Sequence, residues 1–111
     1  MTRKFLFDEK FGLVSQMQRA IASVSSNIAE GASIYSNKDQ HHFYHKAYAS
    51  LMDVLCQLML CLDLGYIKEE EYNKIREAIE KISYQIHQLR KSALNKPSQL
   101  SQPSQPSQPK Y

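Results

Sequence analysis

Residues 44–62, YHKAYASLMDVLCQLMLCL, carry the pattern that decides the fold. Their apolar side chains recur at alternating steps of four and three residues, which is the spacing of one face of an α-helix. The main stripe consists of Tyr44, Tyr48, Leu51, Leu55, Leu58 and Leu62. A second set of side chains widens it, namely Phe43, Ala47, Val54 and Cys61. A stripe this wide predicts a helix that is buried on two sides.

The ends of this central helix also have sequence signals. Ser36 begins the segment SNKD, in which Asp39 stands at the third position after the serine, the spacing of a capping box. At the other end, the run from 64 to 67, LGYI, contains a glycine after the last apolar residue of the stripe. We therefore predict a helix from Ser36 to the neighbourhood of Leu64.

Two more helices are predicted, one on each side of the first. The earlier helix runs from about Asp8, a suitable N-cap, to about Glu30, and Gly31 follows as the residue that ends it. The later helix begins near Lys68, carries three glutamates in its first turn and has Arg90 and Lys91 at its C-terminal end, as the helix dipole favours. Their apolar stripes are Val14, Met17, Ile21, Val24 and Ile28, and Tyr72, Ile75, Ile79, Ile82, Ile86, Leu89 and Ala93.

These elements predict an all-α fold, an up-down antiparallel bundle in which three long helices are present. The short connections make neighbouring helices antiparallel, and the heptad spacing favours left-handed bundle packing. The bundle domain covers residues 1–95. Residues 96–111 repeat Pro-Ser-Gln and are predicted to form a disordered tail, because such a segment cannot bury apolar surface.

The net charge, the cysteines and the length of the apolar runs indicate what kind of protein this is. Of the formal net charge of +3, Lys96 and Lys110 lie in the predicted tail, so the bundle itself is nearly neutral. Cys56 and Cys61 are five residues apart on one helix, too far for an unstrained disulfide, and are interpreted as small core residues in a reducing compartment. The chain has neither a signal-peptide pattern nor a membrane-length apolar run. A soluble, cytoplasmic protein is expected.

Motifs of catalysis and of metal or cofactor binding are missing from the sequence, so no enzyme activity, metal or cofactor is expected. His41, His42 and His45 form the one histidine cluster, and we interpret them as exposed side chains on the first turns of their helix, with a contact to RNA or to another subunit as the alternative. Asn27 and Glu30 are interpreted as hydrogen-bonding residues near a helix end. Tyr44 and Tyr48 are assigned to the core rather than to base stacking.

The segments 11–20 (FGLVSQMQRA) and 23–31 (SVSSNIAEG) resemble the signature of the four-helix-bundle family of 23S rRNA intervening-sequence proteins. Later segments follow in the same order, namely SNKD at 36–39, ASL at 49–51, QL at 57–58, LGYI at 64–67 and EEY at 70–72. The resemblance covers about residues 2–94. It implies a bacterial protein that forms a homo-oligomer, a ring-like pentamer, with Asn27, Glu30 and Gly31 as part of a structural motif and with no catalytic residues.

The sequence departs from the family at several points. The family's first helix is missing, which leaves apolar surface on the first two helices uncovered, and the chain is therefore expected to be oligomeric or poorly soluble. Ser25 stands where proline is usual, and the usual arginine pair is reduced to Arg19. His42 and His45 stand where relatives often have arginine, which weakens the basic surface at neutral pH.

Two functions follow from the sequence. The first is an RNA-associated oligomeric scaffold, whose candidate nucleic-acid-binding residues are Arg19, Lys38, Lys46, His42 and His45. The alternative is a protein-interaction subunit that grips a partner without touching RNA. The family is similar to the accessory variability protein of diversity-generating retroelements, so the resemblance implies a reverse transcriptase as such a partner.

Overall fold

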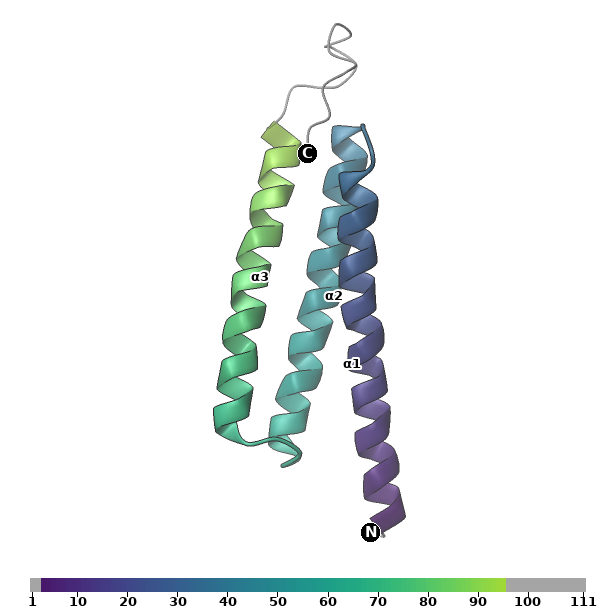
Figure 1. The fold of residues 1–111 in the computed structure, drawn as a ribbon, viewed down its shortest axis with the longest axis vertical. Helices are drawn as coiled ribbons and strands as arrows, with labels where there is room; N and C mark the ends of the chain where they lie inside the picture. The colour runs from purple at the N-terminus through teal and green to yellow at the C-terminus, as the bar shows by residue number, and fades with distance from the viewer. Residues whose placement is uncertain (1–2, 96–111) are drawn as a thin grey trace, which may run out of the picture.

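The computed structural model describes residues 3–95, and it folds them into three long antiparallel helices (Figure 1). The helices are α1 (Arg3–Ala32), α2 (Asn37–Asp63) and α3 (Glu69–Asn95). The predicted all-α, up-down architecture is confirmed. The tail predicted over residues 96–111 lies outside the described residues. Within residues 3–95, no helix combines the length and the apolar character that crossing a membrane requires.

The bounds of α1 differ from the prediction at both ends. The helix begins at Arg3, so Asp8 lies inside it and is not its N-cap. The prediction that Gly31 ends the helix is also wrong, because α1 continues through Gly31 to Ala32. Gly31 is buried against the ring of Tyr44, and a Cβ atom built on it would stand 2.7 Å from the ring carbon Cε1. Glycine is needed here for close packing, not for a left-handed turn.

The predicted cap of α2 is confirmed. Ser36 has an extended backbone, and its Oγ accepts a hydrogen bond of 3.3 Å from the backbone N–H of Asp39. At the other end, the N–H of Tyr66 donates to the carbonyl of Cys61 at 2.8 Å, while Gly65 adopts a positive φ of 78°. This is a Schellman-type ending, for which glycine is the preferred residue.

The start of α3 agrees with the prediction, but its end does not. The backbone N–H of Lys68 donates to the Glu71 carboxylate at 3.0 Å, which satisfies one of the free donors of the first turn. The helix then runs to Asn95, so Arg90 and Lys91 do not lie in its last turn. The dipole argument for these two basic residues is therefore wrong.

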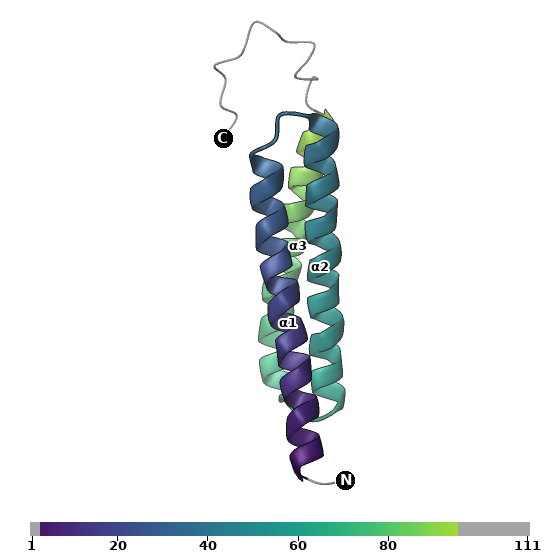
Figure 2. The same cartoon turned by 90° about the vertical axis from the view of Figure 1, so that its right-hand side faces the viewer.

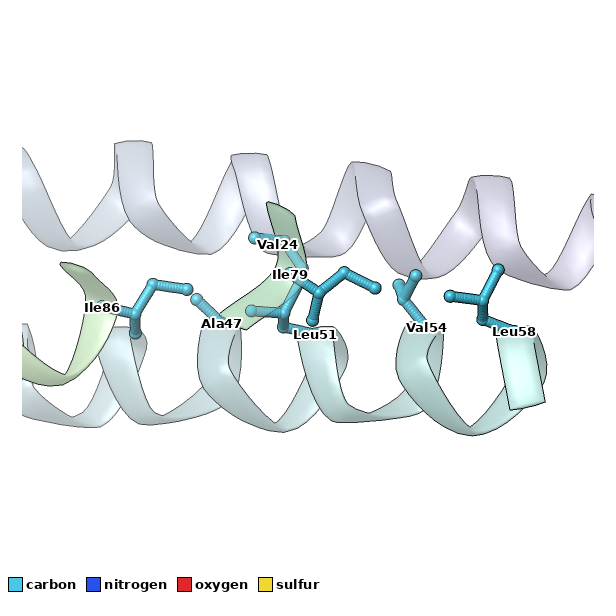
Figure 3. Packing of buried hydrophobic residues seen from close by; sticks show 7 residues of the cluster. All are labelled: Val24, Ala47, Leu51, Val54, Leu58, Ile79 and Ile86. Carbon is cyan, nitrogen blue, oxygen red and sulfur yellow. The ribbon is translucent and has the colours of Figure 1, made fainter. Parts of the chain in front are cut away.

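Helix α2 is the centre of the bundle, because it packs against both α1 and α3 (Figure 1). Figure 2 shows α1 and α2 side by side, with α3 behind them. The predicted burial of α2 on two sides is confirmed. Figure 3 shows the side chain of Leu51 beside Val24 from α1 and Ile79 from α3. The buried cluster is made of Val24, Ala47, Leu51, Val54, Leu58, Ile79 and Ile86. The prediction that both cysteines are core residues holds for Cys61 but is wrong for Cys56, which is exposed because five residues turn a helix by roughly 140°.

The bundle is open on one side, because α1 and α3 pack along α2 but hardly contact each other. Each outer helix carries two apolar rows at seven-residue spacing. On α3, one row is buried against α2 (Ile79, Ile86, Ala93), and the other is 37–42% exposed (Ile75, Ile82, Leu89). On α1, Val24 is buried, whereas Val14 and Ile21 are 37% and 52% exposed.

The exposed rows border a depression of about 400 Å³, which we call the apolar groove. Its floor is formed by Leu51 and Val54 of α2. Its lining has a single polar side chain, Ser25 of α1. In a closed bundle a further helix would cover these rows. Here one of the two apolar rows on each of α1 and α3 faces the groove instead.

Candidate nucleic-acid interface

Four of the predicted RNA-binding residues lie together on the first half of α2. Lys38, His42, His45 and Lys46 are all exposed, and they occupy consecutive turns on the side of α2 that faces away from the apolar groove. We call these four residues the α2 basic face. Half-buried Phe43 supports it, because the His42 ring stacks edge-on at 5.6 Å between centroids and the Lys46 ammonium lies 5.3 Å from the Phe43 centroid.

The fifth predicted residue, Arg19, does not join this face. A hydrogen bond of 2.8 Å between Ser23 Oγ and Ser50 Oγ fixes the level at which α1 and α2 meet. Arg19 precedes Ser23 by four residues, and Lys46 precedes Ser50 by four residues. Because the two helices are antiparallel, Arg19 and Lys46 lie on opposite sides of the Ser23–Ser50 contact along the bundle axis. The two residues are thus separated by about 12 Å along the bundle axis, from eight residues at about 1.5 Å each.

Acidic side chains are interspersed with the basic ones. Asp39 and Asp53 are exposed on α2, and Glu30 is exposed on α1 at about the level of Phe43. The two lysines of the α2 basic face therefore have nearly as many carboxylates as neighbours.

Helix α3 brings one further basic residue, Arg90, to this end, and it was not among the predicted RNA-binding residues. The Arg90 guanidinium lies 5.4 Å from the centroid of the Tyr48 ring, so it covers a tyrosine that is itself half-buried, as the core assignment predicts. His41 lies close enough to Arg90 for the two charges to interact. Partial burial, first of all, and then the Arg90 charge and the neighbouring histidines hold the pKa of His41 below its usual value of 6.5.

The antiparallel topology brings basic and histidine side chains of α2 and α3 together at one end of the bundle. Residues 37–50 of α2 and 82–95 of α3 share this end and hold four lysine or arginine residues, all four histidines of the chain and one carboxylate, Asp39, while Glu30 of α1 lies at the same end. Residues 51–63 and 69–81 share the other end and hold seven carboxylates and three basic residues. Residues 3–22 of α1 add four basic residues and two carboxylates there, so the net charge of that end is small. Arg76 and Glu80 form an exposed salt bridge of 2.9 Å there. The clustering of basic residues and histidines is present in the sequence, but it becomes readable only when α2 and α3 are placed side by side.

The residues of the sequence motif have structural contacts. Asn27 Nδ2 donates to the Ser23 carbonyl at 2.8 Å and to Ser23 Oγ at 3.1 Å, so it supports the serine that bonds to Ser50. The carbonyl of Glu30 accepts from the N–H of Ser33 at 3.2 Å and from its Oγ at 2.9 Å, while the Glu30 side chain is exposed. Of these contacts, the Ser23–Ser50 hydrogen bond crosses from α1 to α2, as does the packing of Gly31 against Tyr44.

In the part of the chain that the structure describes, no group of three or more His, Cys, Asp or Glu side chains is arranged to hold a metal ion. His41 and His45 share a helix face, yet no third ligand of these types joins them within that part.

Two comparisons bear on the identity of the chain. No curated protein matches it closely enough to be taken as a relative. The model of the family described as 23S rRNA-intervening sequence protein matches residues 1–94, which is most of the chain and all three helices. This chain belongs to the family of 23S rRNA-intervening sequence proteins.

Proposed function

We propose that this protein is a non-catalytic, oligomeric helical scaffold that associates with structured RNA through the α2 basic face. The observation that carries the proposal is the α2 basic face itself, four exposed lysine and histidine side chains on consecutive turns of one helix, at the end of the bundle that Arg90 also occupies. Lysine and arginine side chains bind RNA mainly through its phosphates, and exposed groups on consecutive turns of a rigid helix can follow a strand backbone. The family's description names the 23S rRNA intervening sequence, so an RNA of that kind is the first ligand to test.

A filter-binding assay tests the proposal with an rRNA intervening-sequence fragment, an unrelated structured RNA of equal length, and several salt concentrations. The variant pair Lys38→Gln/Lys46→Gln should weaken binding and reduce the slope of log K against log salt by about 1–2, since each phosphate contact contributes roughly 0.7–0.9. The matched control is Lys74→Gln/Lys81→Gln, which removes two exposed lysines from the opposite end of the bundle and should leave the slope nearly unchanged.

Two results would contradict the proposal. One is the absence of binding to either RNA at low salt, which would favour the interaction-only subunit instead. The other is an equal loss of binding for the two lysine pairs, because then the bundle would attract RNA by its total charge and not through the α2 basic face.

A further inference from the structure

A second depression lies between α2 and α3, separate from the apolar groove. Its volume is about 440 Å³, within the range of about 300–1,000 Å³ that is usual for ligand pockets. The apolar groove is lined almost entirely by hydrocarbon, whereas every side chain that lines this depression carries a polar group. The lining consists of Tyr48 from α2 and of Glu80, Ser83, Tyr84, His87 and Arg90 from α3. We call this depression the tyrosine pocket.

The two tyrosines give the pocket aromatic walls. The Tyr84 side chain is 63% exposed, and Gln88 Nε2 donates a hydrogen bond of 2.5 Å to its hydroxyl, which holds the ring along α3. Tyr48 is half-buried, and the Arg90 guanidinium lies over its ring, 5.4 Å from the centroid. Exposed aromatic rings and arginine planes are the surfaces on which proteins stack unpaired nucleobases. The pocket therefore offers a stacking surface to a planar ligand.

The arginine of the pocket has no anionic partner within the described residues. Among residues 3–95, no carboxylate forms an ion pair with Arg90, and its Nε–H is buried without a hydrogen-bond acceptor. A charged donor without an acceptor is costly, so the guanidinium favours an anion that approaches its other N–H groups. His87 is exposed one turn earlier on α3 and can donate to the same anion. Glu80, the one carboxylate in the lining, lies ten residues or about 15 Å from Arg90 along α3 and pairs with Arg76 at 2.9 Å.

The pocket adjoins the α2 basic face. His45 belongs to this face and precedes Tyr48 by three residues, so their side chains lie on neighbouring turns, about 60° apart around α2. Arg90 lies close enough to His41 for their charges to interact, and His41 precedes His45 by one turn. The Arg90 end of the pocket is therefore the end nearest to the basic face. A strand whose phosphates follow the α2 basic face passes beside this end of the pocket.

We propose that the tyrosine pocket binds one unpaired base of the RNA strand that lies on the α2 basic face, with the base against Tyr84 and a phosphate beside Arg90. The inference rests on the proposed RNA binding and adds a preference for unpaired segments. A base inside a duplex is already stacked and paired, so a loop, a bulge or a strand end must supply it. Stacking tolerates every base, so little sequence preference is expected.

The open walls of the pocket favour a base on a strand over a free small molecule. Small-molecule sites bury about 70–90% of their ligand, which walls as exposed as Tyr84 and His87 do not achieve. A base on a bound strand needs less burial, because the contacts of that strand with the α2 basic face already hold the base at a high effective concentration.

Two RNAs with equal numbers of phosphates test the inference by filter binding, namely a hairpin with an unpaired loop and a fully paired duplex. Tyr84→Ala should weaken binding of the hairpin about 5- to 150-fold, the loss of one stacked base, and should leave binding of the duplex nearly unchanged. Tyr84→Phe keeps the ring and should bind the hairpin as the unmodified chain does. The control is Leu94→Ala, which is also on α3 and 62% exposed but does not line the pocket, and it should change neither affinity.

A fluorescence measurement at saturating protein reports the stacking itself. 2-Aminopurine in the hairpin loop loses fluorescence when it stacks on a ring, so the unmodified chain and Tyr84→Phe should quench it more strongly than Tyr84→Ala does. Equal weakening of the hairpin and the duplex by Tyr84→Ala, an unchanged affinity for the hairpin, or equal quenching by all three proteins overturns the inference. Each of these results leaves RNA binding through the α2 basic face standing, whereas the absence of binding to both RNAs overturns the proposed function and the pocket together.

Discussion

The contact between Gly31 and Tyr44 gives the sharpest stability prediction. A Cβ atom on Gly31 would stand 2.7, 3.0 and 3.2 Å from three carbons of the Tyr44 ring, and that ring is only 6% exposed. Overpacking of this kind typically costs about 1–3 kcal/mol. Replacing a helical glycine by alanine returns about 1 kcal/mol through helix propensity. We therefore expect Gly31→Ala to lower the free energy of unfolding by up to about 2 kcal/mol.

Gly12 supplies a matched control, because it also lies inside α1 but a Cβ atom there would have nothing within 4 Å. Gly12→Ala should keep the propensity gain and stabilise the protein by up to about 1 kcal/mol. Urea unfolding followed by far-UV circular dichroism, at one fixed protein concentration, measures both variants. In a Tyr44→Leu background, Gly31→Ala should lose its penalty. The reasoning is refuted if Gly31→Ala and Gly12→Ala stabilise the protein equally.

Three further predictions concern the core, a cap and pH. Ile86→Ala, at a side chain 1% exposed, should cost about 2–5 kcal/mol in urea unfolding, well above the cost of Ile82→Ala at 39% exposure; equal costs would contradict the assignment of the two rows. Ser36→Ala should cost about 1 kcal/mol through loss of the α2 cap, and an unchanged unfolding midpoint would contradict the cap. His41 has a lowered pKa in the folded state, so the unfolded chain takes up this proton first and the free energy of unfolding should fall modestly as the pH drops below about 6.5. In unfolding measured as a function of pH, His41→Gln should flatten that decrease. An unchanged slope in this variant would contradict the prediction.

The fold could be predicted because its signals are local. The 3,4 spacing of the apolar stripes, the serine cap at Ser36 and the glycine at position 65 each depend on neighbouring residues. The function of Gly31 could not be predicted in this way. Near the end of an apolar stripe, a glycine that ends a helix and one that makes room for a ring have the same sequence context. Only the position of Tyr44, thirteen residues later, separates them.

The site could be predicted only in part for the same reason. Lys38, His42, His45 and Lys46 are close in sequence, and their common face follows from helical spacing. Arg90 was missed because its place beside His41 depends on the pairing of α2 with α3. The sequence also cannot tell Ile79 from Ile82. Both belong to one apolar stripe, and only packing shows which one faces α2 and which one faces the apolar groove.

The account depends most on the claim that structured RNA binds through the α2 basic face. The salt dependence of RNA binding, measured by filter binding for the unmodified chain and for Lys38→Gln/Lys46→Gln, tests this claim directly. We predict that the double substitution reduces the slope of log K against log salt by about 1–2. An unchanged slope would contradict the claim.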